Sequence, residues 1–284
     1  WNDATKTCTM TKDLVGAGQH LIAMNNGGVT LDGAGYKLTG TQLAEDPAEV
    51  GKGNAAIIAN DVDNFVIKNV VIDGVWQHGI RTISTNNGLI TGNTITLSYH
   101  YGIDSKSDDN LKITNNIISV GYTGIVLWNA DGDANCSFLV KQNTVSNAQN
   151  GGIKDVIGDK TCIDQNTVTS NSGVGIVVTN SVGSKVTNNV VNGNGHGISV
   201  SSNSDGIIVT DNTANNNTYK GFTLDTSSHI TTFTGNTATG NGKHAYGIVV
   251  EGALTGAISG NEFKGALVAA GDDSERVGII VSRA

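Results

Sequence analysis

Residues 164–212 read DQNTVTSNSGVGIVVTNSVGSKVTNNVVNGNGHGISVSSNSDGIIVTDN, a stretch in which two features recur at a nearly constant step. Asn166, Asn189 and Asn212 each end a short polar segment, and they follow one another at intervals of 23 residues. Gly175 and Gly197 stand 22 residues apart, and an Ile follows each of them. Self-similarity with a period of about 20–50 residues is typical of a solenoid made of stacked turns.

Both columns extend over most of the chain. The asparagine column has intervals of 24, 23, 27, 23, 23, 23, 24 and 25 residues and consists of Asn69, Asn93, Asn116, Asn143, Asn166, Asn189, Asn212, Asn236 and Asn261. The glycine column, in which Ile or Phe follows each Gly, consists of Gly79, Gly102, Gly124, Gly152, Gly175, Gly197, Gly221, Gly247 and Gly278. Short runs that alternate in polarity come after these glycines, which predicts strands with one buried face.

A period of 23 residues has the length needed for one turn of a three-sided coil, because it traces roughly 75 Å at about 3.3 Å per strand residue. We therefore predict an all-β, single-domain, right-handed parallel β-helix of about ten rungs. Residues 1–53 break the period and are expected to form the N-terminal cap and the first irregular rungs, with regular rungs in 54–284. The segment Leu43–Val50, which contains the only proline, Pro47, is expected to be an irregular or briefly helical excursion.

Stacked rungs place equivalent side chains above one another, so the asparagine column predicts a side-chain amide ladder; a series of solvated asparagine turns is the alternative. Cys136 and Cys162 lie about one rung apart and are expected either to form a disulfide or to pack as buried free thiols. The third cysteine, Cys8, leaves an odd number, and no spacing typical of a zinc site is present.

Composition limits the classes of function. A formal net charge of -8 argues against nucleic-acid binding, which requires a basic face. No apolar run approaches the roughly 18 residues of a membrane span, so we expect a soluble protein that does not bind membranes. The chain starts at Trp1 without a signal-peptide pattern, from which we expect a processed, secreted protein, and nothing in it demands an oligomer, so we expect a monomer.

A group of charged and aromatic residues falls on one predicted outward face, because the residues one and three places after each repeat Ile point away from the core. Four consecutive rungs contribute this group, which consists of Arg81, Asp104, Lys106, Trp128 and Lys154, with His78 and Tyr101 immediately before two repeat glycines. The three cations form a basic patch suited to a carboxylated ligand, and Trp128 offers a surface on which a sugar ring can stack. The alternative is that these side chains only solvate a strand.

The segment Tyr101-Gly102-Ile103-Asp104-Ser105-Lys106 resembles the Tyr-Gly-Phe-Asp-Pro-His signature of secreted mannuronan C-5 epimerases, which are right-handed β-helix enzymes. The repeat as a whole, including residues 28–36, resembles the pectate-lyase-like superfamily. The resemblance implies catalytic roles for Tyr101 and Asp104. Lys106 stands where the signature has His, and Trp128 or Asn129 stands near the place of its second catalytic Asp.

Lyases and C-5 epimerases of uronates both begin by removing the proton at C-5, next to a carboxylate that must be neutralised. Replacement of the signature His by Lys106 favours a polysaccharide lyase that cleaves a uronic-acid polymer, first of all alginate or polymannuronate, by β-elimination. We expect Tyr101 and Lys106 to act as base and acid, with Arg81 and Lys106 lowering the pKa of Tyr101 and Asp104 orienting either partner. The expected substrate-binding residues are Arg81, Lys154, His78 and Trp128.

Three alternatives stay open at this point. The first is a mannuronan C-5 epimerase, and the second is a glycoside hydrolase that uses Asp225 and Glu251, two carboxylates on adjacent rungs. The third is a non-catalytic, carbohydrate-binding β-helix. No cofactor is expected to be required. Calcium is conceivable at the turn Asp131–Asn135, but this turn lacks the ligands of a full calcium loop, so we expect a solvated turn and no metal site.

Overall fold

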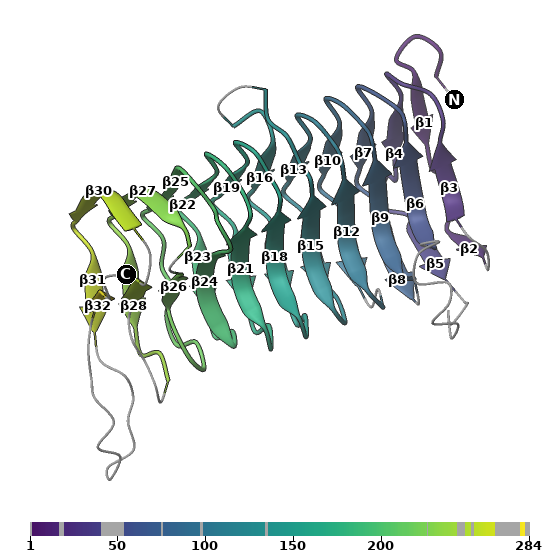
Figure 1. Cartoon of the computed structure of the whole chain (residues 1–284). Coiled ribbons are helices and arrows are strands. Elements are labelled where there is room, and N and C mark those ends of the chain that lie inside the picture. Colours follow the sequence, from purple (N-terminus) through teal and green to yellow (C-terminus); the bar gives the residue numbers. More distant parts are fainter. Residues whose placement is uncertain are drawn as a thin grey trace.

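The computed structural model describes residues 2–16, 20–40, 54–74, 76–96, 99–133, 136–225, 227–242, 248–250, 253–264 and 279–281; it does not describe the side chains of 248–250, 253–258, 263–264 and 279–281. These residues form a stack of parallel strands that extends from the early strands at one end to β30 and β31 at the other (Figure 1). The described residues contain no α-helix, and therefore none long and apolar enough to cross a membrane.

The strands form three parallel sheets, one on each side of the coil. Sheet A contains, in spatial order, β1 (Thr7–Thr9), β4 (Thr30–Asp32), β7 (Val66–Lys68), β10 (Leu89–Thr91), β13 (Lys112–Thr114), β16 (Leu139–Lys141), β19 (Cys162–Asp164), β22 (Lys185–Thr187), β25 (Ile207–Thr210), β27 (His229–Thr234) and β30 (Ala253–Ser259). Sheet B contains β2 (Leu14–Gly16), β5 (Lys37–Gly40), β8 (Val71–Gly74), β11 (Thr94–Thr96), β14 (Ile117–Ser119), β17 (Thr144–Ser146), β20 (Thr167–Thr169) and β23 (Val190–Asn192), and β28 (Thr237–Thr239) pairs separately with β31 (Glu262–Lys264).

Sheet C is the side that carries the candidate site. It contains β3 (His20–Met24), β6 (Ala55–Asn60), β9 (His78–Ile83), β12 (Tyr101–Lys106), β15 (Thr123–Trp128), β18 (Gly151–Val156), β21 (Val174–Thr179), β24 (His196–Ser201), β26 (Phe222–Leu224), β29 (Ile248–Val250) and β32 (Ile279–Val281). Most rungs thus supply one strand to each sheet in turn, whereas the rung of β25 and β26 has only an isolated bridge at Thr213 on the side of sheet B. The predicted all-β parallel solenoid is confirmed.

The glycine column faces the core. A Cβ on Gly79 would lie 2.7 Å from Ile95 Cγ2 and 2.6 Å from the carbonyl oxygen of Gly102, so no larger residue fits there. The following Ile80 is also fully buried. Because two successive residues turn inward, the residue before the repeat glycine lies on the outer face of sheet C in strands such as β9 and β12. This local irregularity places His78 and its neighbours in the site.

The predicted asparagine ladder is present from Asn93 onward, but Asn69 does not belong to it: Asn69 is exposed, and Val70 occupies the equivalent position, where its N–H donates to Asn93 Oδ1. Asn116 Nδ2 donates to Asn143 Oδ1 at 2.9 Å, and the backbone N–H of Asn116 donates to the same oxygen at 3.0 Å. The same pattern repeats from Asn93 to Asn261, and the ladder residues up to Asn236 are buried. A second ladder, which the sequence reasoning missed, stacks Asn171, Asn194, Asn217 and Asn241 along the turn between sheets B and C. Both ladders satisfy buried backbone groups at the corners of the coil.

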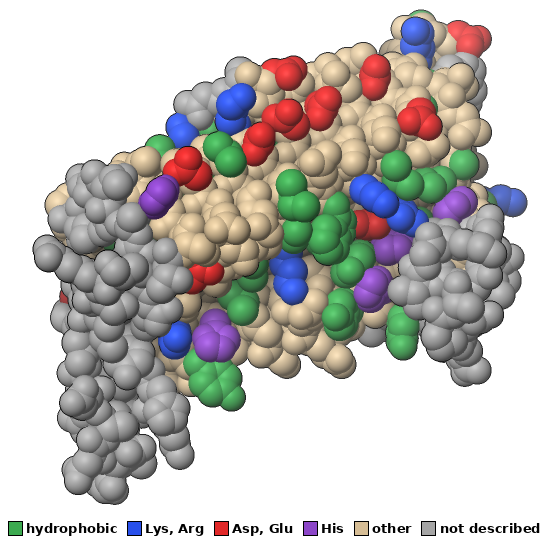
Figure 2. All heavy atoms as spheres, viewed as in Figure 1, with side chains coloured by type: hydrophobic (Ala, Val, Ile, Leu, Met, Phe, Trp, Pro, Cys, Tyr) green, Lys and Arg blue, Asp and Glu red, His purple; other side chains and the backbone are tan. Residues whose placement is uncertain are grey.

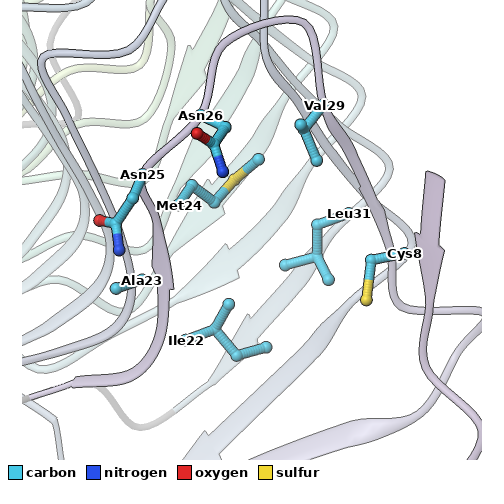
Figure 3. A pocket seen from close by; sticks show the side chains of 8 residues that line it. All are labelled: Cys8, Ile22, Ala23, Met24, Asn25, Asn26, Val29 and Leu31. Carbon is cyan, nitrogen blue, oxygen red and sulfur yellow. The ribbon is translucent and has the colours of Figure 1, made fainter. Parts of the chain in front are cut away.

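The first turns already belong to the stack, since Leu31 of β4 lies opposite Ile67 of β7. At this end a hollow of about 190 Å³ opens between β1, β3 and β4. Figure 3 shows the side chains of Met24, Leu31 and Cys8 converging on it. The division into a cap at 1–53 and regular rungs at 54–284 stays a prediction, and the expected excursion at Leu43–Val50 lies outside the described residues.

Cys136 and Cys162 form a disulfide, which confirms the bridge and excludes the buried free thiols. Cys162 begins β19, and Cys136 ends the longest of the turns between sheets C and A, so the disulfide ties this turn to the following rung. Cys8 is a free, exposed thiol.

Candidate active site

Strands β9, β12, β15 and β18 bring the seven predicted site residues onto the outer face of sheet C, five of them in two rows. The first row runs from His78 through Tyr101 and Thr123 to Gly151, and the second from Arg81 through Asp104 and Val126 to Lys154. Lys106 and Trp128 lie opposite one another in a third row at the far end of the strands. Figure 2 shows basic, acidic, histidine and hydrophobic side chains gathered on this face, beside a broad area in tan.

Asp104 is buried and forms an ion pair with Arg81, next to His78. Its Oδ2 is 3.1 Å from Arg81 Nε and 3.5 Å from His78 Nδ1, and the Asp104 side chain is only 4% exposed. The contact with Arg81 is one of charge, because Arg81 Nε has no aligned hydrogen-bond acceptor among the described residues. Burial raises the pKa of Asp104 to about 6 although Arg81 opposes the rise, and burial lowers the pKa of His78 to about 3. At neutral pH His78 is therefore uncharged.

Tyr101 is part of an aromatic cluster at the edge between the B–C turn and sheet C. Its ring stacks on His100 with 3.8 Å between centroids, and His100 stacks on Tyr122 at 4.8 Å. Burial and the Asp104 carboxylate raise the pKa of Tyr101. The expectation that Arg81 and Lys106 lower this pKa is therefore wrong, because the desolvated phenol faces a carboxylate. Burial lowers the pKa of His100, which favours a neutral imidazole beside a protonated phenol.

Lys154 bends back toward the row of Tyr101. A Cβ on Gly151 would lie 3.0 Å from Lys154 Cε, so the absence of a side chain at Gly151 makes room for the lysine. Gly151 is opposite Thr123, which is opposite Tyr101, so the end of Lys154 lies about two strand spacings, or about 10 Å, from Tyr101. Burial lowers the pKa of the Lys154 ammonium. This half-buried cation and Tyr101 thus lie along the same row of sheet C.

Tyr101 and Lys106 are not brought together. They stand at opposite ends of β12, five residues or about 16 Å apart along the strand, and the Tyr101 ring packs against His100 rather than toward Lys106. Trp128 is 37% exposed beside Lys106, with Val156 opposite it on the next rung. The predicted pairing of Tyr101 with Lys106 as base and acid does not fit this arrangement.

The sequence reasoning did not select His100 and Tyr122, although both contact the Tyr101 cluster. Both stand two places before a repeat glycine and just before a strand begins, a column that strand alternation does not assign to either face. The signal that was available is compositional: Tyr99, His100 and Tyr101 are consecutive, and Tyr122 follows one rung later in a chain with 5% aromatic residues.

Other candidates lie apart from this cluster. Among the described residues no group of three His, Cys, Asp or Glu side chains is arranged to hold a metal ion, and Asn135 of the possible calcium turn is not described. Asp225 accepts hydrogen bonds from Ser202, Ser227 and Ser228, and these bonds outweigh burial and keep its pKa low. Its proposed partner Glu251 lies outside the described residues, so the two-carboxylate hypothesis stays untested.

Fold and site together define the class of the protein as a parallel β-helix with an ionisable, aromatic face on one sheet. A family model described as the right-handed β-helix region matches residues 55–134 and 129–282. The chain therefore belongs to the right-handed β-helix family, as its repeat predicts. Comparison with curated proteins gives no significant match.

Several solved structures share the fold. The periplasmic alginate epimerase AlgG has a TM-score of 0.62 at 15% identity, covering 95% of this chain and 73% of that one. The A-module of the mannuronan C-5 epimerase AlgE4 from Azotobacter vinelandii has a TM-score of 0.56 at 14% identity, with 98% and 86% covered. PfbA, a surface adhesin of Streptococcus pneumoniae, has a TM-score of 0.50 at 12% identity, with 99% and 86% covered. At such identities the likeness concerns the fold.

Proposed function

We propose that the protein is a polysaccharide lyase that cleaves a uronic-acid polymer, with polymannuronate as its first substrate, by proton abstraction at C-5 and β-elimination. The observation that carries this proposal is the stacking of a neutral imidazole on a protonated phenol, His100 on Tyr101, at the edge of sheet C toward which the half-buried ammonium of Lys154 bends. Groups with shifted pKa values in one place are typical of acid–base catalysis.

Each group has a defined role in the proposed reaction. Lys154 holds the sugar carboxylate and offsets the charge that develops when the C-5 proton leaves. His100 accepts that proton, the electron pair of the C–H bond forms the C-4–C-5 double bond, and the C-4–oxygen bond breaks. Tyr101 donates its proton to the departing glycosidic oxygen. Solvent then removes the proton from His100 and returns one to Tyr101, so the products are a new chain end and an unsaturated uronate.

The Asp104–Arg81 ion pair influences the protonation of Tyr101 through its charge. The carboxylate of Asp104 favours the protonated form of Tyr101 and thereby keeps the phenol available as an acid. Arg81 compensates the charge of Asp104, to which its Nε is 3.1 Å distant. His78 lies between this pair and the Tyr101 ring, with its centroid 5.3 Å from that of Tyr101. These three residues are assigned to positioning, and Lys106 and Trp128 to binding of a neighbouring sugar residue.

The position of the acid and the base on the same side favours polymannuronate. His100 and Tyr101 stack against each other, so both reach one face of a bound ring. In D-mannuronate the C-5 hydrogen and the C-4 oxygen lie on the same face of the ring, whereas in guluronate and galacturonate they lie on opposite faces. A one-sided pair therefore suits elimination from mannuronate.

A mannuronan C-5 epimerase is the second candidate. It is favoured by the match at Tyr101 and Asp104 and by the names of two of the similar structures, a mannuronan epimerase and an alginate epimerase. Epimerisation requires return of a proton to the opposite face of the ring, and the stacked pair offers both of its groups to one face. We therefore rank elimination first.

The Cys136–Cys162 disulfide is typical of proteins in oxidising compartments and supports a secreted or periplasmic location. The partner we propose is an acidic polysaccharide, bound by a monomer. Because Lys154 supplies the positive charge, the proposed reaction needs no metal cofactor, and turnover is expected to continue in the presence of EDTA.

The test is incubation with polymannuronate, polyguluronate and pectate, with ultraviolet absorbance reporting the unsaturated uronate and proton NMR reporting the configuration at C-5. Rising absorbance with polymannuronate supports the lyase. Inverted C-5 signals without absorbance indicate the epimerase. No change in any polymer contradicts both and leaves the hydrolase or the binding protein.

A further inference from the structure

A second recess lies at the edge of sheet C, at a distance from Tyr101. It is an open hollow of about 450 Å³ on the turn between sheets B and C. Three successive rungs line it, through Ser170, Asn171, Ser172, Gly193, Asn194, Gly195, Thr218 and Tyr219. None of these side chains is charged, and most carry a hydroxyl or amide group.

The hollow has a cause in the sequence. The turn from Asn194 to Gly197 spans three residues, whereas the equivalent turns from Asn171 to Gly175 and from Asn217 to Gly221 span four. The short turn therefore lies between two longer ones and leaves a depression. The stacked, buried asparagines beneath it fix the floor, since Asn171 Nδ2 donates to Asn194 Oδ1 at 2.8 Å.

One side of the hollow carries a supported aromatic ring. Tyr219 is 49% exposed, and its ring stacks on His196 with 4.9 Å between centroids and 26° between planes. Lys220 follows in the sequence, near enough to His196 to influence its charge. Figure 2 shows a second gathering of a basic, a histidine and a hydrophobic side chain on this part of the surface. A ring fixed beside hydroxyl and amide groups and a cation suits an acidic sugar.

The hollow is aligned with the candidate active site. Strand pairing places Tyr101, Thr123, Gly151, Val174 and His196 in one row, which spans four strand spacings or about 19 Å. The positions between the two aromatic clusters are occupied by small or short side chains. The Lys154 side chain also reaches this row, beside Gly151, and the proposed function assigns it to the polymer, so a polymer that runs along this edge contacts it.

We propose that Tyr219, His196 and Lys220 form a distal subsite for a uronate residue of the same polysaccharide chain, about four rungs from Tyr101. Tyr219 stacks on the sugar ring, Lys220 binds its carboxylate, and Asn, Ser and Thr groups of the hollow bind its hydroxyls. This inference rests on the proposed function for the identity of the polymer. The subsite makes long chains bind more tightly than short ones.

The experiment measures the affinity of wild type, Tyr219→Ala and Tyr219→Phe for mannuronate oligomers of increasing length by calorimetry. Tyr36→Ala is the matched control, because Tyr36 is an exposed tyrosine on the turn between β4 and β5. We expect Tyr219→Ala to bind long oligomers up to about tenfold more weakly, since a stacked ring contributes about 0.5–1.5 kcal/mol. Oligomers too short to span the 19 Å row should bind to wild type and to Tyr219→Ala with equal affinity. Tyr219→Phe should retain the wild-type affinity for oligomers of every length.

Equal affinity of wild type and Tyr219→Ala for long oligomers, with the fold intact by circular dichroism, overturns the subsite. A loss of affinity that is the same for short and long oligomers also overturns it, because the residue then acts elsewhere. The proposed function fails by a different result, the absence of unsaturated product. A length-dependent difference without product therefore supports the subsite while it contradicts the lyase.

Discussion

Arg81 and Asp104 lie directly opposite each other on adjacent strands of sheet C, with Nε 3.1 Å from Oδ2. Burial raises the pKa of Asp104 to about 6 even in the presence of this cation. Replacement by Arg81→Met removes the compensating charge, so we expect the pKa of Asp104 to rise further, leaving the residue protonated at neutral pH. Carbon NMR of the carboxyl group measures the midpoint directly.

The same variant tests the positioning role of the pair. If the Asp104 carboxylate favours the protonated form of Tyr101, loss of the compensating cation in Arg81→Met raises the pKa of Tyr101 further, and the basic limb of the pH–activity profile moves to higher pH. Lys68→Met is the control. Lys68 likewise forms an ion pair with an aspartate on an adjacent strand, with its Nζ 3.2 Å from Asp32 Oδ2, but this pair lies on sheet A, away from the candidate site. An unchanged Asp104 midpoint in Arg81→Met contradicts the electrostatic account.

The buried carboxyl group of Asp155 should make the stability of the protein depend on pH. It is fully buried, and although Thr161 and Ser184 donate hydrogen bonds to its Oδ2, burial raises its pKa from 3.8 to about 6. The folded state therefore binds a proton more tightly than the unfolded state, so this contribution to stability is complete below about pH 4 and is lost as pH rises through 6. We expect a loss of up to about 3 kcal/mol over that range.

Urea unfolding at pH values from 4 to 8 measures this effect, and Asp155→Asn should flatten the decline. The exposed Asp205 provides the matched control, since Asp205→Asn leaves the buried carboxyl unchanged. If the free energy of unfolding falls equally steeply with pH in wild type and in Asp155→Asn, groups other than Asp155 cause the pH dependence.

Substitution of Ile157 should stabilise the protein, because this residue has an unfavourable backbone conformation. It has a φ of 59° and is the single β-branched residue with positive φ in the described part of the chain. Asn129 and Asn180 occupy the equivalent positions on the neighbouring rungs, each with a φ of 52°. Because asparagine tolerates this conformation and the Ile157 side chain is 53% exposed, Ile157→Asn should raise the free energy of unfolding by about 1 kcal/mol.

The control for Ile157 is Val182→Asn, which replaces an exposed β-branched residue that does not have positive φ. Chemical denaturation compares the two variants. If Val182→Asn stabilises the protein as much as Ile157→Asn, relief of backbone strain is not the cause.

The Cys136–Cys162 disulfide encloses a sequence separation of 26 residues. By the chain-entropy relation its removal in the double variant Cys136→Ser, Cys162→Ser should cost about 3.5 kcal/mol. Cys8→Ser should leave the stability unchanged, because Cys8 is a free, exposed thiol. Thermal unfolding with and without reductant checks this: reductant should lower the Tm of wild type and leave that of the double variant in place, and equal sensitivity of both would contradict the assignment.

The fold was predictable because its determinants are local and repeated. Gly79 has no space for a Cβ, and the buried Asn116 bonds to its counterpart on the next rung, so each rung requires the same residue at the same place. Positions at which a single rung departs from the repeat were not predictable in this way. His100 and Tyr122 contact Tyr101 through turns that differ in length from rung to rung.

The sequence predicts which charged residues share this face, but it does not predict their effect on the pKa values or on the contacts of the site. The column of Arg81, Asp104 and Lys154 follows from strand alternation alone. The direction of the Tyr101 pKa depends on how deeply the ring is buried and on its nearest charge, which is the Asp104 carboxylate. The approach of Lys154 to the row of Tyr101 depends on the missing side chain of Gly151, three residues earlier on the same strand. Such effects require the packed structure.

The central claim is best tested by the absorbance of unsaturated uronate formed from polymannuronate by wild type, Tyr101→Phe and Tyr36→Phe. We expect wild type and Tyr36→Phe to form the product at equal rates and Tyr101→Phe to be slower by about 10²–10⁴-fold with its fold intact, the range typical of a lost general acid. Equal rates for wild type and Tyr101→Phe, or no product from any of the three proteins, would contradict the account.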